Sequence, residues 1–327
     1  MRVFPSLAVL GGALLLCLAA TSAGLAASPA GAAFQCQQGD CQDGEGLALL
    51  PNGDRYIGRF MAGRPRGAGA LLGKDGTIAE GMFLNDFGMG HGDFSLADGT
   101  RYSGQFFNGL ANGRGKKSFP SGAAYDGVWR NNVFFRGRGI EFAADGSRYD
   151  GDFDQGTYHG QGTLTTTDGS EYVGTFEKGQ RQGGGKLTRS DGSVYIGEFV
   201  GGVIQGKGTL AFIDGTKYEG LFENGLYHGQ GLLTQGDGTR YTGNFAKGVF
   251  DGQGTIVYPD ESEYRGVFKT GLYHGYGTLL TSAGDRMEGD FVEGAYVENA
   301  DRKELIVVEP LPQPPDVGGE DHAPDAP

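Results

Sequence analysis

The chain has few cysteines and histidines and no excess of basic residues. Its 327 residues include 3 Cys and 5 His, and 27 Lys and Arg stand against 40 Asp and Glu, a net charge of −13. A nucleic-acid-binding protein needs a basic face to neutralise phosphates, and a purely electrostatic hold on anionic lipid needs one too. The charge balance therefore predicts no nucleic-acid partner and disfavours lipid binding by charge alone.

Motifs of catalysis are also missing. The sequence contains no Gly-x-Ser-x-Gly elbow and no HExxH pair. Residues Gly201 to Lys207 match the Gly-x-x-x-x-Gly-Lys of a phosphate-binding loop, but Gly208 follows where a Ser or Thr would hold magnesium. A strand pattern, and not a helix pattern, comes next. We therefore expect no enzymatic activity and no cofactor.

Three alternating carboxylates resemble the start of a calcium-binding loop. Asp150, Asp152 and Asp154 have the EF-hand spacing, but Gln155 stands where the loop needs Gly, and Gln161 where it needs Glu. A solvated acidic strand face is the favoured interpretation, and a weak surface cation site is the alternative.

The first 33 residues are typical of an export signal. Arg2 is a minimal charged start, Leu7 to Ala20 is an apolar run, and small residues follow at Gly24 to Ala26 and Gly31 to Ala33 as candidate cleavage sites. This predicts a periplasmic or extracellular protein, and anchoring by an uncleaved segment is the alternative. In an oxidising compartment, Cys36 and Cys41 are expected to form a disulfide, the alternative being two free thiols.

Glycine is in large excess, with 64 residues, or roughly 20% of the chain against a usual share of about 7%. Collagen is excluded because glycine does not recur at every third residue. Disordered low complexity is disfavoured because disorder is poor in aromatic residues, and this chain has 15 Tyr and 21 Phe. A repeat that needs glycine at fixed positions is left.

Such a repeat runs through the chain, with the frame Tyr-x-Gly-x-Phe, then Gly, Gly-x-Gly and Asp-Gly. Successive copies open every 23 residues, with one step of 24 between Tyr125 and Tyr149, where the copy also has Trp129 in place of Phe. The openings are Tyr56, Ala79, Tyr102, Tyr125, Tyr149, Tyr172, Tyr195, Tyr218, Tyr241, Tyr264 and Met287. Over residues 44–294 this pattern resembles the MORN (membrane occupation and recognition nexus) repeat family.

The spacing predicts a β-hairpin for each copy. Residues two apart share one face of a strand, so the Tyr, Gly and Phe of the frame point the same way, and rings from a neighbouring strand can cover the glycines. A three-residue loop, Ser190 to Gly192, pairs Leu187 with Tyr195 on one buried face, whereas a two-residue turn would separate them. The expected fold is all-β: an elongated, single-layer antiparallel meander of tandem 23-residue hairpins.

The expected organisation has five parts. A signal segment spans residues 1–33, an N-terminal cap with the disulfide 34–55, the MORN array 56–300, a C-terminal cap strand 301–308 and a disordered, Pro-rich acidic tail 309–327.

Residues that vary between copies are the candidate binding surface. Phe134 and Phe135, beside the extra residue and Trp129, form the strongest candidate. A second candidate is a stripe of Tyr-His pairs at one repeat position, although a structural role as turn residues before Gly is the favoured interpretation. Its members are Tyr158, His159, Tyr227, His228, Tyr273 and His274. Copies lie roughly 10 Å apart in a meander, so no two of these histidines could share a zinc ion.

These observations favour a non-enzymatic scaffold of the cell envelope or secreted space that binds protein partners along the repeats. A membrane or phospholipid tether is the first alternative, because the resemblance to the MORN family implies it. Glycan binding by the aromatic groove is a further alternative.

Overall fold

The computed structural model describes residues 34–85, 89–107, 109–299 and 302–307. The predicted signal segment 1–33 and the predicted tail 309–327 lie outside these residues. Secondary structure in the described part is entirely β. No helix there is long and apolar enough to cross a membrane.

The chain divides into two compact units, with the boundary after Gly160, inside β12. The strands of unit 1 are β1 (Gln35–Gly39), β2 (Glu45–Leu49), β3 (Arg55–Met61), β4 (Arg64–Leu72), β5 (Ile78–Asn85), β6 (Met89–Ser95), β7 (Arg101–Phe107), β8 (Leu110–Ser118), β9 (Ala124–Arg130), β10 (Val133–Phe142), β11 (Arg148–Asp154) and the start of β12 (Thr157–Thr165). The strands that follow in unit 2 are β13 (Glu171–Glu177), β14 (Gln180–Thr188), β15 (Val194–Val200), β16 (Val203–Ala211), β17 (Lys217–Glu223), β18 (Leu226–Thr234), β19 (Arg240–Ala246), β20 (Val249–Val257), β21 (Glu263–Lys269), β22 (Leu272–Leu280), β23 (Arg286–Val292), β24 (Ala295–Asn299) and β25 (Arg302–Val307).

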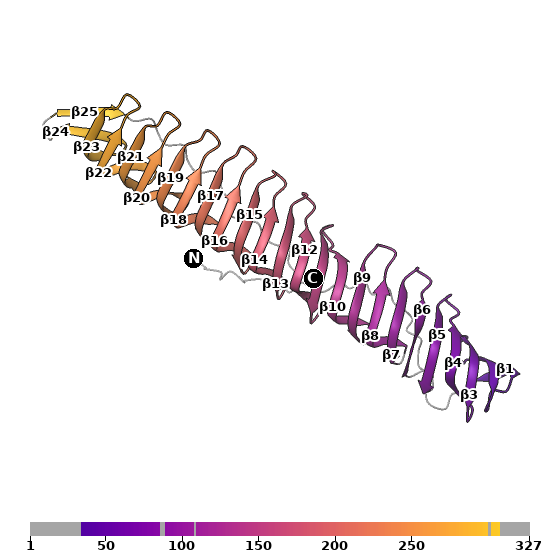
Figure 1. The fold of residues 1–327 in the computed structure, drawn as a ribbon. Coiled ribbons are helices and arrows are strands. Elements are labelled where there is room, and N and C mark those ends of the chain that lie inside the picture. The colour runs from indigo at the N-terminus through magenta and orange to yellow at the C-terminus, as the bar shows by residue number, and fades with distance from the viewer. Residues whose placement is uncertain (1–33, 86–88, 108, 300–301, 308–327) are drawn as a thin grey trace, which may run out of the picture. The chain divides into compact units, whose positions relative to one another are not determined.

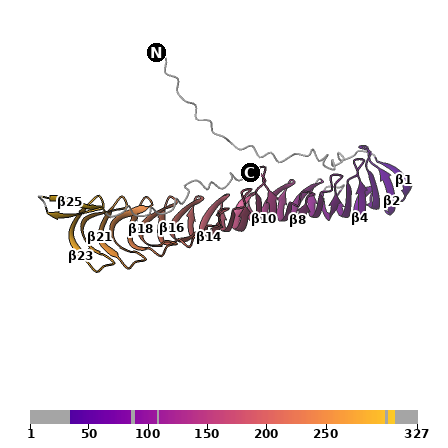
Figure 2. The same cartoon turned by 90° about the horizontal axis from the view of Figure 1, so that it is seen from above.

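Strands that are neighbours in sequence are neighbours in space. From β1 to β11 each strand pairs antiparallel with the next, and so does each strand from β13 to β25. Figure 1 shows this order within each unit, and Figure 2 shows that each unit is one layer of strands. The predicted antiparallel meander of hairpins is confirmed.

The core is a layer of aromatic rings on one side of the sheet, here called the inner face. In β13 Tyr172 and Phe176 are buried, and their rings meet edge to face at 5.1 Å. The ring of Tyr172 also meets that of Phe199 in the next copy at 5.0 Å. Burial raises the pKa of Tyr172 to about 12. The opposite side of the sheet, the outer face, carries mainly polar and partly exposed side chains.

Glycine makes room for these rings, as the sequence predicts. Gly174 and Gly185 face each other across β13 and β14, and a Cβ on either would lie 2.4 Å from an atom of the Tyr172 side chain. The Tyr172 hydroxyl then donates a hydrogen bond to the carbonyl oxygen of Thr175, at 3.0 Å. The bond satisfies the one polar atom of a ring that is otherwise buried.

The predicted three-residue loop is confirmed. Leu187 pairs with Tyr195, and both are buried. The amide of Gly192 donates to the carbonyl of Arg189, and Gly192 has a φ of +83°. These features define a turn closed by a residue in the left-handed region, for which glycine is favoured.

In the copy that opens at Tyr218, a two-residue turn joins the two strands of the hairpin. Glu223 pairs directly with Leu226, and the two residues between them, Asn224 and Gly225, have φ values of +52° and +78°. This is the two-residue turn that fits the twist of a hairpin. A bulge follows in the second strand of the hairpin: in the copy that opens at Tyr172, Gly183 has a φ of +65°, and the register shifts after Gly174.

The two ends of the array are closed by short strands. A disulfide joins Cys36 and Cys41, as predicted, and Cys41 is buried beside β2. At the other end β25 (Arg302–Val307) pairs antiparallel with β24.

Candidate interaction surfaces

Most of the aromatic residues predicted as a binding surface lie in the core. Each of the five is at most 9% exposed: Trp129, Phe134, Tyr158, Tyr227 and Tyr273. The two-residue turn explains this, because it sets Tyr227 opposite Phe222 on the inner face. Their rings are therefore not accessible to a partner in the folded protein.

Stacking holds these rings in place. Tyr158 lies on Tyr149 with ring centroids 3.8 Å apart, and Tyr227 lies on Tyr218 at the same distance. Each pair lies within one copy, and Tyr227 also meets Phe245 of the next copy with ring centroids 5.7 Å apart. The Tyr members of the predicted stripe thus stabilise the sheet.

The remaining predicted residues are accessible. Phe135 is partly exposed on β10, and the guanidinium of Arg130 lies 3.4 Å from its ring centroid. His159, His228 and His274 are also partly exposed. Among the residues that the structure describes, no group of three or more His, Cys, Asp and Glu side chains could hold a metal ion.

The acidic strand β11 follows the favoured interpretation. Tyr149 and Phe153 are buried, while Asp150, Asp152 and Asp154 are partly exposed between them. Asp150 accepts a hydrogen bond from Arg148 at 2.8 Å.

The copy that opens at Tyr125 differs from the others in register. Tyr125 pairs with Gly139, whereas Tyr172 of a regular copy pairs with Leu187. Unlike the buried Tyr172, Tyr125 is partly exposed. The extra residue of this copy is therefore accommodated by a shift that loosens the cover over its tyrosine.

At the two strand positions that flank this copy, charged residues occur where other copies have Leu, Ile or Phe. Lys117 pairs with Tyr102, and Glu141 pairs with Tyr149, which places both on the inner face. The Lys117 ammonium lies 5.5 Å from the Trp129 ring centroid, and burial raises the pKa of Glu141. In the sequence, these two charged residues interrupt the run of apolar residues at this position. That interruption is the signal that could have predicted the irregular packing of this copy.

A cluster of exposed apolar side chains on the outer face covers β3 to β5. Five large apolar side chains there are 41–51% exposed: Ile57, Met61, Ile78, Met82 and Leu84. The pairing of β3 with β4 and of β4 with β5 makes the three strands adjacent. Contiguous exposed apolar surface of this kind marks an interaction site more often than isolated residues do. We call it the β3–β5 face.

Arginines lie within and beside the β3–β5 face. Arg55 and Arg59 alternate with Ile57 and Met61 along β3, and all four are exposed. Arg66 on β4 lies 3.4 Å from the sulfur of Met61. Acidic residues are fewer: Glu80 lies on β5 within the face, and Glu45 pairs with Arg59 at its edge. The face therefore combines apolar and basic side chains in an acidic chain.

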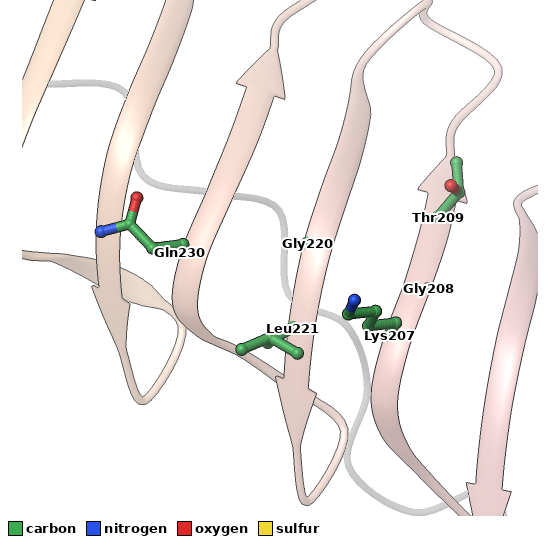
Figure 3. A pocket seen from close by; sticks show the side chains of 6 residues that line it. All are labelled: Lys207, Gly208, Thr209, Gly220, Leu221 and Gln230. Atoms are coloured by element: carbon green, nitrogen blue, oxygen red, sulfur yellow. The ribbon is translucent and has the colours of Figure 1, made fainter.

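A second feature of the outer face is an open depression over β16 to β18 with a volume of about 470 Å³. Gly208 and Gly220 form its floor, and Lys207, Leu221 and Gln230 stand around it (Figure 3). The phosphate-loop resemblance ends here, because Lys207 lies within the strand β16 and no helix follows.

The family model for the MORN repeat matches residues 80–101, 102–124, 149–171, 172–194, 195–217, 218–240, 241–263 and 264–286. These segments make up more than half of the chain, which therefore belongs to the MORN-repeat family. The matches omit residues 125–148, the copy whose register is shifted. A repeat array of this family implies a role in binding or scaffolding. No curated protein matches the chain.

Solved structures give only weak likenesses. The TCP10 domain of Danio rerio CPAP, solved in complex with a peptide of Danio rerio STIL, is 13% identical, with 79% of this chain and 99% of that chain covered and a TM-score of 0.29. A streptogramin B lyase is 13% identical, with 80% and 89% covered and a TM-score of 0.15. Values this low carry no information about function.

Proposed function

We propose that this protein is a non-enzymatic scaffold of the cell envelope or secreted space that binds a protein partner through the β3–β5 face. The observation that carries the proposal is the exposure of five large apolar side chains on three adjacent strands. Burial of apolar surface contributes about 25 cal/mol per Å² removed from water, so covering this face favours association. The location follows from the export signal expected in residues 1–33.

The inner face supports this choice by elimination. Its rings are packed against one another, so a glycan would find no free aromatic surface on the regular copies. Glycan binding by an aromatic groove therefore has no observation in its favour.

A membrane tether is the second candidate, because apolar and arginine side chains together also suit an anionic bilayer. The net charge of −13 opposes it at long range. Co-sedimentation of residues 34–327 with anionic and zwitterionic vesicles separates the two functions: pelleting would favour the tether, and a chain left in the supernatant would reject it.

The decisive experiment for protein binding compares two variants of the chain 34–327 as bait. Ile57→Ser with Met82→Ser removes the centre of the β3–β5 face, and Ile213→Ser is the matched control, since Ile213 is 83% exposed in unit 2. Chemical cross-linking in intact cells followed by mass spectrometry identifies the partners. Partners held by the wild type and by the control, and lost from the double variant, support the proposal. Equal recovery with all three baits would reject the face.

A further inference from the structure

Basic residues are concentrated on the three strands of the β3–β5 face. These strands contain four arginines and one acidic residue, Glu80. The arginines are Arg55, Arg59, Arg64 and Arg66. Residues 34–160 as a whole contain 13 Lys and Arg against 15 Asp and Glu, a net charge of −2, and residues 161–327 contain 13 against 25, a net charge of −12. An acidic partner would therefore be repelled by the second half of the chain and attracted to this face.

On β3, arginines alternate with apolar residues along one side of the strand. Arg55, Ile57, Arg59 and Met61 are all exposed, whereas the tyrosine and the phenylalanine of the strand are buried. Residues two apart in a strand lie roughly 7 Å apart, so a cation and an apolar group alternate at that spacing on the outer face. Arginine suits recognition of an acidic side chain because its planar guanidinium binds a carboxylate through two hydrogen bonds.

The neighbouring strands place more apolar surface beside these arginines. Ala70 pairs with Ile57 on one side, and Ala68 pairs with the exposed Met82 on the other. The aliphatic stem of Arg59 lies over Gly67 of β4, where a Cβ would be 3.5 Å from the arginine Cδ. A segment that lies along β3 would therefore meet apolar groups next to each guanidinium.

An extended segment fits the spacing on β3 better than a helix does. Side chains two residues apart in an extended segment point the same way and keep the same spacing of roughly 7 Å. The nearest match in a helix is every fourth residue, and each such step turns the side chain by about 40° around the helix axis. Over the four outer positions of β3, only an extended segment keeps all its side chains on the face.

We propose that the β3–β5 face binds an extended segment of a partner protein whose side chains alternate between acidic and apolar on one side. Its carboxylates lie opposite Arg55 and Arg59, and its apolar side chains lie opposite Ile57 and Met61. The proposal rests on the protein-binding function proposed above and adds the chemistry of the partner.

Synthetic peptides test this chemistry on the chain 34–327. The matched probe has Glu and Leu in turn at every second position, with Ser between them, so that one side of the extended peptide carries both. The shuffled probe has the same composition but carries Glu and Leu on opposite sides. Fluorescence anisotropy of the labelled peptides measures each Kd. We expect the matched probe to bind about tenfold more tightly than the shuffled probe, because only its carboxylates and apolar groups meet the face together.

Neutral variants show where the matched probe binds. Arg55→Gln with Arg59→Gln should weaken its binding about tenfold, because two carboxylates lose their partners. The matched control is Arg101→Gln with Arg136→Gln, which removes the same charge from two exposed arginines on β7 and β10. The control should leave the Kd unchanged. A Kd that is equal for the matched and shuffled probes, or equal for the two variants, overturns the proposal.

A charge reversal keeps the test independent of losses in folding. Arg55→Glu with Arg59→Glu should weaken the matched probe and strengthen a probe that has Lys in place of Glu. A shuffled Lys probe carries the same charge, so a folded face is needed for the matched Lys probe to gain more than the shuffled one. An equal gain for both would overturn the proposal.

This proposal and the proposed function fail in different ways. If the matched probe does not bind while partner capture still depends on Ile57 and Met82, the face is a docking surface for a partner of another chemistry. If partner capture is also indifferent to these residues, the face has no binding role and both proposals are wrong. Anionic vesicles that pellet the chain through Arg55 and Arg59, while no probe binds, would assign the face to a membrane and overturn both.

Discussion

The ring of Tyr172 lies directly over Gly185 on the neighbouring strand, so that a Cβ at residue 185 would lie 2.4 Å from the tyrosine Cε2. The same relationship joins Tyr195 to Gly208 and Tyr218 to Gly231. Each copy therefore depends on a glycine whose role is steric. This distinguishes it from the turn glycines, whose role is conformational.

Three consecutive glycines allow these roles to be separated by alanine substitution. Gly185 lies under Tyr172, Gly183 has a φ of +65° with open space around it, and Gly184 has neither constraint. We expect Gly185→Ala to be the most destabilising, by about 1–3 kcal/mol from overpacking. Gly183→Ala should cost about 1 kcal/mol through backbone strain, and Gly184→Ala should be neutral. Urea midpoints measured by circular dichroism give the order, and an equal loss at all three positions would contradict the steric role.

Much of this fold follows from the sequence because the frame repeats. Alternation predicts which face Tyr172 and Phe176 share, and parity across Ser190 to Gly192 predicts that Leu187 meets Tyr195. Each copy repeats the same pattern of apolar residues and glycines, so a strand assignment that is ambiguous in one copy is resolved by the other copies.

The candidate site was harder to predict, for a local reason. Whether Tyr227 is buried depends on the turn at Asn224 and Gly225, and the repeat frame does not specify the length of that turn. The repeat frame also does not predict the β3–β5 face, because the residues at outer-face positions such as Ile57 and Met82 differ from copy to copy. A cluster forms there only when strands that lie side by side carry exposed apolar residues on the same face.

The Asp-Gly loops predict a pH dependence. Asp168 accepts hydrogen bonds from the Thr166 hydroxyl at 2.5 Å and from the Ser170 amide at 3.0 Å. These bonds, the Thr166 hydroxyl first, lower the pKa of Asp168 to about 2. Because the folded pKa lies below the unfolded value, the stabilisation is complete above about pH 4 and is lost as the pH falls towards 2.

Asp168→Ala tests this dependence against the wild type. The variant should be less stable at neutral pH by up to about 1 kcal/mol, a modest value because the carboxylate is exposed to solvent. The difference should shrink as the pH approaches 2. Paired urea titrations at pH 7 and pH 2 measure it, and a difference that stays constant between the two would show that the carboxylate charge does not matter.

Removing the disulfide should have a local effect. The bridge between Cys36 and Cys41 closes a short loop, and the loop-entropy relation gives about 2 kcal/mol for a loop of this size. We expect Cys36→Ser with Cys41→Ser to speed hydrogen exchange in β1 and β2 and to leave β13 to β23 unchanged, because each repeat is stabilised mainly by its neighbours. Faster exchange throughout the chain would instead indicate cooperative coupling along all copies.

Phe134 and Phe135 are adjacent in sequence but should respond differently to substitution. Phe134 is 9% exposed and contacts Tyr125 and Trp129 at ring distances of 4.9 and 5.1 Å. Phe134→Ala should therefore destabilise this copy by about 3 kcal/mol, as large-to-small core substitutions do. Phe135→Ala removes only a partly exposed ring and its contact with Arg130, worth about 0.5–1 kcal/mol.

Partner capture measured beside stability then separates a contact residue from a core residue. If Phe135 touches a partner, Phe135→Ala weakens capture while the thermal unfolding curve stays close to that of the wild type. Phe134→Ala should weaken capture only at temperatures where the copy begins to unfold. Loss of capture by Phe134→Ala under fully native conditions would mean that the inner face opens to admit a partner, and the packed aromatic layer would then be a binding surface as well as a core.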